Sequence, residues 1–168
     1  MKVYGVIGWK NSGKTGLMER LIIALRAQGF SVSSIKHAHH AFDIDRPGKD
    51  SFRHRQAGAG EVLLASRHRW VLMHENTPDQ EPALAALLAR LSPVDIVLVE
   101  GYKRDSHPKI EAHRAATGQP LIAQDDPTVR AVASDRHAEL PAMGWQGPAF
   151  DLDDAEALAR FILSDLGL

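Results

Sequence analysis

The stretch GWKNSGKT, residues 8–15, decides the fold. It matches the Walker A pattern G-x-x-x-x-G-K-[ST] with Gly8, Gly13, Lys14 and Thr15. The glycines of such a loop let the backbone bend so that successive N–H groups point at phosphate oxygens. The lysine reaches the β- and γ-phosphates, and the hydroxyl ligates Mg²⁺. These residues therefore predict a site for the phosphates of a nucleoside triphosphate and its magnesium.

The residues on either side of the loop supply the strand and the helix that it requires. Residues 3–7 form a short β-branched and aromatic run that stops at Gly8, as a buried strand does. Residues 14–28 carry leucine and isoleucine at helical spacing, and Gly29 is a suitable end for this helix. Residues 31–37 then read as a second strand. Together they predict one right-handed βαβ unit.

The rest of the chain continues the alternation of strands and helices. Further strands are predicted at 61–66, 70–74, 95–100, 109–113, 121–123 and 129–133, and helices at 51–58, 79–91 and 153–166. The alternation favours a mostly parallel sheet covered on both faces, which is the α/β, three-layer P-loop NTPase fold. The 168 residues suffice for a single domain, 1–168. Two strands alone cannot bury both faces, so we expect the small β-hairpin extension around 59–75 to be a dimerisation arm.

Composition narrows the class of protein. A net charge of −1 argues against nucleic-acid binding through bulk electrostatics. The chain has no cysteine, so disulfides and thiolate metal sites are excluded. It has no signal-peptide pattern and no apolar run long enough to span a bilayer. We therefore expect a cytoplasmic protein with neither nucleic acid nor membrane as a partner.

An acidic residue is expected beside the phosphate loop, because P-loop proteins place one at the end of a neighbouring strand to hold magnesium. Glu100 follows the most apolar strand of the chain and is the candidate, against the alternative of a solvated acid before Gly101. The position after Gly8 is of separate interest, since one P-loop subgroup carries there a lysine that acts on a partner subunit. Here that residue is Trp9, and Lys10 follows, so Lys10 is interpreted as a lysine near phosphates in cis or as a solvated one.

Residues 36–55 form a polar loop that is dense in functional groups and allows three interpretations. A metal site would use three histidines: His37, His39 and His40. An anion site would use four basic residues: Lys36, Lys49, Arg53 and Arg55. The third interpretation is a solvated loop. Anion binding is favoured, because the histidines lack the i,i+4 spacing of a common zinc site.

KHAHHAFDIDRPGKDSFRHRQAGA at 36–59, together with GWKNSGKT at 8–15 and VEGYK at 99–103, resembles the molybdopterin-guanine dinucleotide biosynthesis protein B (MobB) family. The resemblance covers most of residues 1–115. It implies a GTP-binding accessory protein and weak GTPase in molybdenum cofactor maturation, with GTP and Mg²⁺ as cofactors. Such a protein assists the attachment of GMP to molybdopterin. It acts as a homodimer with the cofactor nucleotidyltransferase as its partner, and molybdopterin itself is a further candidate ligand.

The resemblance also assigns residues. Those implied in nucleotide binding are Gly8, Asn11, Ser12, Gly13, Lys14, Thr15, Glu100 and Gly101, with Thr15 and Glu100 on the metal. Those implied in the anion or partner loop are Lys36, His37, Asp43, Asp45, Lys49, Asp50 and Arg53. The guanine motif N/T-K-x-D of many GTPases is absent. Asp135 lies where it is expected and is the candidate acceptor for the guanine N1 and N2 donors.

Two other classes of function are compatible with the sequence. A small-molecule kinase could use the same phosphate loop, with Arg53 and Arg55 on an acceptor. A metal-binding regulator could use the histidines of the loop. No residue is evident as an activator of water: His107 precedes Pro108 in a polar turn and is expected to be solvated. We therefore expect any hydrolysis to be slow.

Overall fold

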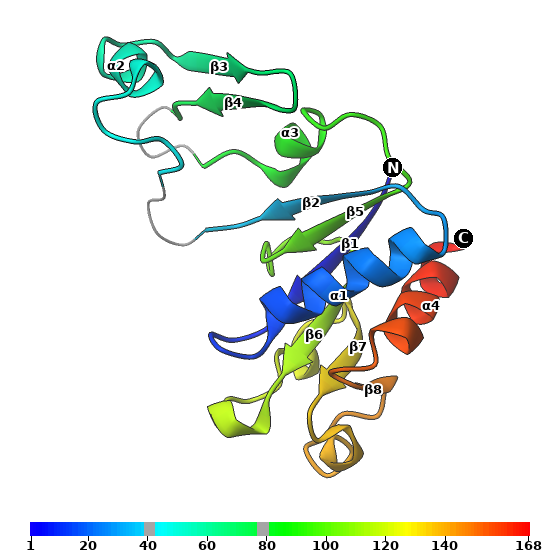
Figure 1. Ribbon diagram of the computed structural model, residues 1–168. Coiled ribbons are helices and arrows are strands. Elements are labelled where there is room, and N and C mark those ends of the chain that lie inside the picture. The colour runs from blue at the N-terminus through cyan, green and yellow to red at the C-terminus, as the bar shows by residue number, and fades with distance from the viewer. Residues whose placement is uncertain (39–42, 77–80) are drawn as a thin grey trace. The chain divides into compact units, whose positions relative to one another are not determined.

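The computed structural model describes residues 1–38, 43–76 and 81–168 (Figure 1). The chain divides into two compact units. The first contains Met1–His37 and Leu91–Leu168, and the second contains Ala38–Arg90. The histidines His39 and His40 of the metal interpretation lie outside the described residues.

The first unit is built on a six-stranded sheet in the order β2-β5-β1-β6-β7-β8, and every described pair of neighbours is parallel. Its strands are β1 (Lys2–Ile7), β2 (Val32–Lys36), β5 (Ile96–Glu100), β6 (Lys109–His113), β7 (Val129–Ser134) and β8 (Ala149–Asp151). Its helices are α1 (Lys14–Ala27) and α4 (Ala155–Leu166), with the short 3-10 helices η1 (Ala115–Thr117), η2 (Ile122–Gln124) and η3 (His137–Glu139). The predicted parallel α/β sheet is confirmed.

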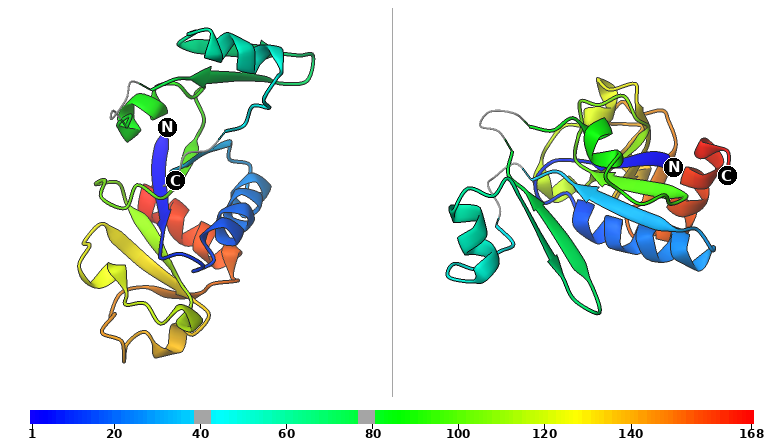
Figure 2. Two further views of the ribbon diagram at one scale, coloured as in Figure 1. Left: turned by 90° about the vertical axis from the view of Figure 1, so that its left-hand side faces the viewer. Right: turned by 90° about the horizontal axis from the view of Figure 1, so that it is seen from above.

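Helices α1 and α4 lie side by side on one face of this sheet (Figures 1 and 2). Their apolar stripes enclose the main core, which includes Leu17 and Leu21 of α1, Leu158 and Ile162 of α4, and Tyr4 of β1. Removing such leucines and isoleucines from water supplies about 1.5–3 kcal/mol each. This packing fixes α1 on the sheet, and the start of α1 carries the phosphate loop.

On the opposite face of the sheet, residues around η2 and around η3 pack against β1 and β7. Leu121, Val132 and Leu140 form a second apolar cluster there with Ile7. The predicted strand at 121–123 is wrong, because Ile122–Gln124 is a 3-10 helix. Its start is fixed by the buried carboxylate of Glu111, which accepts hydrogen bonds from the N–H groups of Ile122 and Ala123 at 3.0 and 2.8 Å.

The second unit contains a two-stranded antiparallel hairpin and two short helices. Its elements are α2 (Asp50–Gln56), β3 (Glu61–Ala65), β4 (Trp70–His74) and α3 (Leu84–Leu88). The hairpin occurs where two strand-like runs predicted it. The helix predicted at 79–91 is too long in its described part: it begins after Pro82, which disfavours helical backbone at Glu81. No helix in the described part of the chain is long and apolar enough to cross a membrane.

Candidate nucleotide site at the phosphate loop

The phosphate loop has the bend that its glycines predict. Gly8 and Gly13 have φ angles of 147° and 93°, and Asn11 between them has a φ of 64°. A Cβ atom on Gly8 would overlap the carbonyl oxygen of Ala112 in the neighbouring strand β6. Gly8 therefore allows the loop to lie close against the sheet before α1 begins at Lys14. The first N–H groups of α1 have no partner within the helix and can donate to phosphate oxygens.

Lys14 is held across this loop. Its Nζ donates a hydrogen bond to the carbonyl oxygen of Trp9 at 2.7 Å. Burial lowers the pKa of the Lys14 ammonium; Glu100 opposes this shift, and the positive charges of Lys36 and Lys103 add to it. An anion in the loop would offset that accumulation of positive charge.

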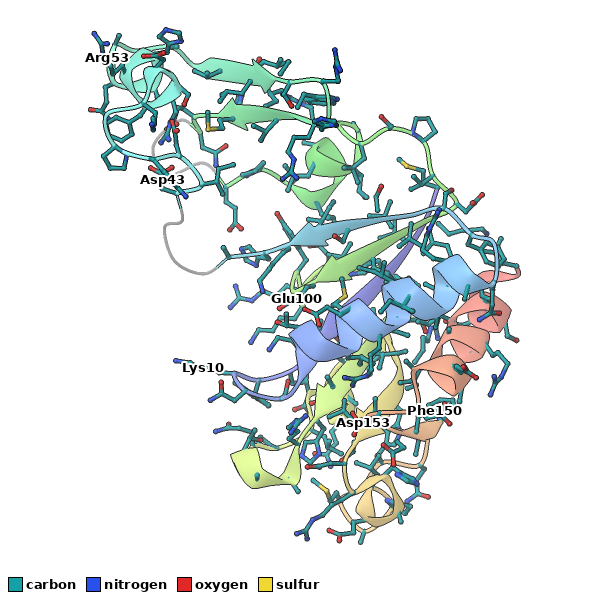
Figure 3. The ribbon with its side chains drawn as sticks, viewed as in Figure 1. Lys10, Asp43, Arg53, Glu100, Phe150 and Asp153 are labelled. Atoms are coloured by element: carbon teal, nitrogen blue, oxygen red, sulfur yellow. The ribbon has the colours of Figure 1, made fainter. Side chains whose placement is uncertain are left out.

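The order of the strands brings Glu100 to the phosphate loop. Strand β5 lies between β1 and β2, with Glu100 in register with Val6 on one side and Lys36 on the other. The Glu100 side chain is buried, and its Oε1 lies 3.4 Å from the Thr15 hydroxyl and 3.3 Å from Lys36 Nζ. Figure 3 shows Glu100 at the end of β5, above the first turn of α1. The two residues expected to hold magnesium therefore lie together.

These residues line a hollow of about 340 Å³. Its walls are residues 11–16 of the loop and helix α1, together with Glu100 and Arg114. Six of the predicted nucleotide residues line it: Asn11, Ser12, Gly13, Lys14, Thr15 and Glu100. The Ser12 hydroxyl is buried and has no hydrogen-bond partner among the described residues. The hollow thus gathers backbone donors, a lysine and a hydroxyl–carboxylate pair, as a nucleoside triphosphate with magnesium requires.

Gly101 and His37 flank Glu100. Gly101 has a φ of 95°, and a Cβ at this position would lie 2.8 Å from Cβ of His37. The backbone N–H of His37 donates to the carbonyl oxygen of Glu100 at 2.9 Å. The His37 ring stacks on Tyr102 with ring centroids 4.6 Å apart. The predicted pair Glu100-Gly101 is therefore part of a tightly packed strand end that also fixes His37.

Asp135 lies at the exposed end of β7, outside the lining of the phosphate hollow. Its Oδ1 accepts a hydrogen bond from the N–H of Ala115 at 3.0 Å. The residue before Ala115 is Arg114, which does line the hollow. Asp135 therefore ties the end of β7 to the segment that carries Arg114, and its other carboxylate oxygen has no partner among the residues described.

The other residues of the predicted anion or partner loop, from Asp43 to Arg53, lie in the second unit. Arg55 is its centre: the guanidinium contacts Asp43, Asp45 and Glu75 at 2.9, 3.5 and 2.6 Å. Asp45 also accepts a hydrogen bond from the Ser51 hydroxyl at 2.8 Å. Asp43 and Asp45 therefore form ion pairs with Arg55. In this arrangement the Arg55 guanidinium is not available to bind an anionic ligand.

The other members of this loop are exposed. Lys49 precedes α2, Asp50 begins it, and Arg53 projects from it (Figure 3). Across the described residues, no group of three or more His, Asp or Glu side chains is placed to hold a metal ion. Of the predicted basic residues of this loop in the second unit, Lys49 and Arg53 are thus open to solvent, as is Arg46 beside them.

Sequence reasoning missed Arg114 and Lys103 near the phosphate loop and gave the wrong environment for His107. Arg114 directly follows strand β6, so its place at the end of a parallel strand was a usable signal. Lys103 belongs to the quoted VEGYK motif, and its Nζ lies 5.0 Å from the centroid of the Trp9 ring. His107 was expected to be solvated, which is wrong. Both ring nitrogens are buried without a partner among the described residues, because the ring packs against Gly5, and burial lowers its pKa.

The sheet, the phosphate loop and the strand-end carboxylate together define a P-loop nucleotide-binding fold. Residues 3–135 match the family described as MobB, "Molybdopterin guanine dinucleotide synthesis protein B". The chain belongs to this family.

Two relatives agree with this assignment, and one solved structure has the same fold. A "Molybdopterin-guanine dinucleotide biosynthesis adapter protein" of Escherichia coli (strain K12) is 40% identical over 158 residues, which are 92% of this chain and 87% of that protein. The protein of the same name from Haemophilus influenzae is 42% identical over 139 residues, or 81% and 76% of the two chains. A crystal structure of "molybdopterin-guanine biosynthesis protein B (mobB)" has a TM-score of 0.74 at 24% identity and covers 98% of this chain and 99% of its own; it supports the fold.

Proposed function

We propose that the chain is a GTP-binding accessory protein in the biosynthesis of molybdopterin guanine dinucleotide. The observation that carries the nucleotide part is the contact between the Thr15 hydroxyl and Glu100 beside Lys14, in one hollow with the bent phosphate loop. The pathway is supported by membership of the MobB family and by relatives named as biosynthesis adapter proteins. An adapter acts with other proteins of its pathway, and we propose the nucleotidyltransferase that attaches GMP as its partner. Molybdopterin is a further candidate ligand.

Magnesium fits the donor atoms of this site. A hydroxyl and a carboxylate are the hard oxygen ligands that Mg²⁺ prefers, and the ion usually completes its shell with water and substrate phosphates. Thr15 and Glu100 would hold the ion, which would neutralise charge on the phosphate chain. Lys36 Nζ lies 3.3 Å from Oε1 of Glu100. Its positive charge can therefore neutralise this carboxylate when no magnesium ion is bound.

The preference for guanine rests on the family resemblance and on Asp135. A carboxylate oxygen can accept from the N1 and N2 donors of guanine, whereas adenine presents no such pair of donors on that edge. Asp135 uses Oδ1 for Ala115. Its second oxygen is the candidate acceptor for the base.

Slow hydrolysis fits what surrounds the phosphate loop. The imidazole of His107, the nearest histidine after the Glu100 strand in sequence, is buried against Gly5. No residue among those described is placed as a base for the attacking water. We therefore propose at most a weak GTPase, with turnover well below about 10 per second.

A homodimer is the proposed assembly, and the hairpin of the second unit is its proposed contact. One face of the hairpin carries Leu63 and Trp70, which are 59% and 65% exposed, with Leu72 opposite Leu63. Within the described residues, no further strand pairs with either outer edge of the hairpin. A second copy would cover this apolar face and those edges. A cytoplasmic location remains part of the proposal and rests on the sequence.

The kinase alternative receives less support from the second unit. Its acceptor clamp was to be Arg53 with Arg55, and three carboxylates already engage Arg55. Arg53 alone is a solvent-exposed arginine on α2. Transfer of labelled γ-phosphate to a metabolite would be needed to favour this function over the accessory one.

Calorimetric titration with GTP and with ATP, each with Mg²⁺ and with EDTA, tests the proposal. We expect saturable GTP binding that is tighter than ATP binding and strengthened by Mg²⁺. The Lys14→Ala variant should lose triphosphate binding, because it removes the ammonium of the loop, whereas Arg26→Ala, at the other end of α1, should bind as the wild type does. A preference for ATP, or equal binding by Lys14→Ala, would overturn the proposal.

A further inference from the structure

A second hollow adjoins the phosphate loop. Its volume is about 540 Å³, and its polar and aromatic lining residues are Trp9, Lys10, Asn11, Arg114, Thr117 and Gln119. All of them lie in the first unit. Asn11 and Arg114 also line the hollow of the phosphate loop, so the two spaces share a wall.

The charged side chains that line this second hollow are all positive. Arg114 and Lys10 line it, and no carboxylate does. Neither cation has an ion-pair partner in the part of the chain that the structure describes. Figure 3 shows Lys10 extended away from the loop, which puts its ammonium at the rim. A space walled by two unpaired cations and by neutral polar groups is suited to an anion.

The walls are fixed by contacts that do not need a ligand. The Trp9 indole Nε1 donates to the carbonyl oxygen of Pro120 at 2.8 Å, and Lys103 lies over the same ring. Arg114 packs so closely on the loop that a Cβ on Gly13 would lie 3.0 Å from its Nε. The bond from Ala115 to Asp135 holds the backbone beside Arg114. The hollow is therefore formed before any ligand enters.

We propose that this hollow is a subsite for a second ligand, an organic phosphate monoester, which binds beside the nucleotide. Its phosphate lies against Arg114, whose planar guanidinium presents several donors and faces both spaces. Its organic part lies along the Trp9 indole, which supplies an apolar wall. A volume of about 540 Å³ is of the size that organic ligands occupy and is more than inorganic phosphate needs. The subsite rests on the proposed function in that the nucleotide occupies the neighbouring hollow.

Titration of phenyl phosphate into the full chain, saturated with a non-hydrolysable GTP analogue and Mg²⁺, tests this proposal. Calorimetry gives affinity and stoichiometry. The ¹⁵N spectrum shows one indole N–H signal for each of the three tryptophans, and the Trp9→Phe variant identifies that of Trp9. We expect one phenyl phosphate per chain, a shift of the Trp9 signal with those of Trp70 and Trp145 unmoved, and no binding of phenol.

Three variants assign the binding to this hollow. Arg114→Ala should weaken phenyl phosphate binding by about ten-fold or more, because it removes a charged hydrogen-bond donor. Lys10→Ala, at the rim, should weaken it by about two- to three-fold. Arg26→Ala also removes one positive charge but lies at the far end of α1, and it should leave the binding unchanged.

The outcomes separate the subsite from the proposed function. If the analogue binds and phenyl phosphate does not, or if the two compete for one site, the subsite is wrong and the nucleotide function stands. If the analogue fails to bind but the nucleotide-free chain binds phenyl phosphate with a shift of the Trp9 signal, and Arg114→Ala weakens this binding while Lys14→Ala does not, the subsite stands and the function falls. Binding that is equal in Arg114→Ala and the wild type also overturns the subsite.

Discussion

The hydroxyl of Thr15 lies 3.4 Å from Oε1 of Glu100, although 85 positions separate the two residues in the chain. A parallel sheet produces this contact, because β1 and β5 are neighbours and both end at the same edge. The pair supplies one neutral and one anionic oxygen on the phosphate side of the loop. Four predictions follow from this contact and from three other features.

Replacing Glu100 with glutamine should remove most of the effect of Mg²⁺ on nucleotide affinity. The substitution keeps the shape of the side chain but lowers its affinity for the metal, and we expect GTP binding in Mg²⁺ to weaken at least about ten-fold. Binding in EDTA should change much less. Calorimetric titration in both buffers measures the difference, with the exposed Glu156→Gln as control. Equal responses to Mg²⁺ in Glu100→Gln and the wild type would exclude Glu100 as a metal ligand.

Substituting Gly8 with alanine should destabilise the fold as well as the site. Its φ of 147° and the collision of a Cβ with Ala112 both oppose a side chain. We expect a loss of about 1–3 kcal/mol in the free energy of unfolding, measured by urea titration. Gly60→Ala is the matched control, since nothing lies within 4 Å of that position and its φ is not positive; it should stay within about 0.5 kcal/mol. Similar losses in both variants would contradict this account.

Glu111 should make stability depend on pH. Burial raises the pKa of its carboxyl above the ordinary value of 4.5, and the hydrogen bonds from Ile122 and Ala123 oppose this shift. Across the window from about 4.5 to the raised pKa, the folded chain keeps a proton that the unfolded chain has released. The contribution of Glu111 to stability is therefore complete below that window and decreases as the pH rises through it.

The measurement compares unfolding free energies of the wild type and of Glu111→Gln between pH 4 and pH 8. Glutamine does not titrate, so the advantage of the wild type over the variant should shrink with rising pH and then stay constant. Glu139→Gln, on the exposed helix η3, is the control for the loss of one carboxyl group. An advantage that grows with pH would show that the backbone donors, and not burial, dominate at this carboxylate.

Charge on the exposed face of the hairpin should dissociate the proposed dimer. Trp70→Lys and Leu63→Lys each place an ammonium in a face that a second copy would bury, so both should sediment as monomers at micromolar concentration. Ile23→Lys is the matched control, because Ile23 is 68% exposed on α1 and lies outside the hairpin. A wild type that is itself monomeric at this concentration would overturn the dimer.

The sequence was enough to predict those strands, helices and turns that depend only on the pattern of neighbouring residues. The run before Gly8, the helix after Gly13 and the apolar strand before Glu100 are all present, because each depends on spacing within a few residues. Glu100 was therefore found as a strand-end acid from sequence. Its closeness to Lys36 was not, because that contact depends on the insertion of β5 between β1 and β2.

The predictions of secondary structure and of solvent exposure are wrong where a residue distant in sequence overrides the preference of the local sequence. Residues 121–123 have a strand-like composition, yet Glu111 takes their N–H groups and leaves a short 3-10 helix. The solvation expected of His107 fails because Gly5 has no side chain and admits the ring. Strand β8 was missed, since three residues provide too short a pattern. For Arg114, the sequence offered its position at the end of a strand, but its place beside the phosphate loop depends on the pairing of β6 with β1.

The adjacency of β2 and β5 has a consequence for how this chain can vary. Parallel neighbours need a crossover to connect them, and here the crossover is the whole unit Ala38–Arg90. The register between the two strands is set by their own residues, from Val32 with Ile96 to Lys36 with Glu100. The register that places Glu100 beside Lys36 is therefore set within the sheet, and it does not require any particular length or surface of the unit Ala38–Arg90.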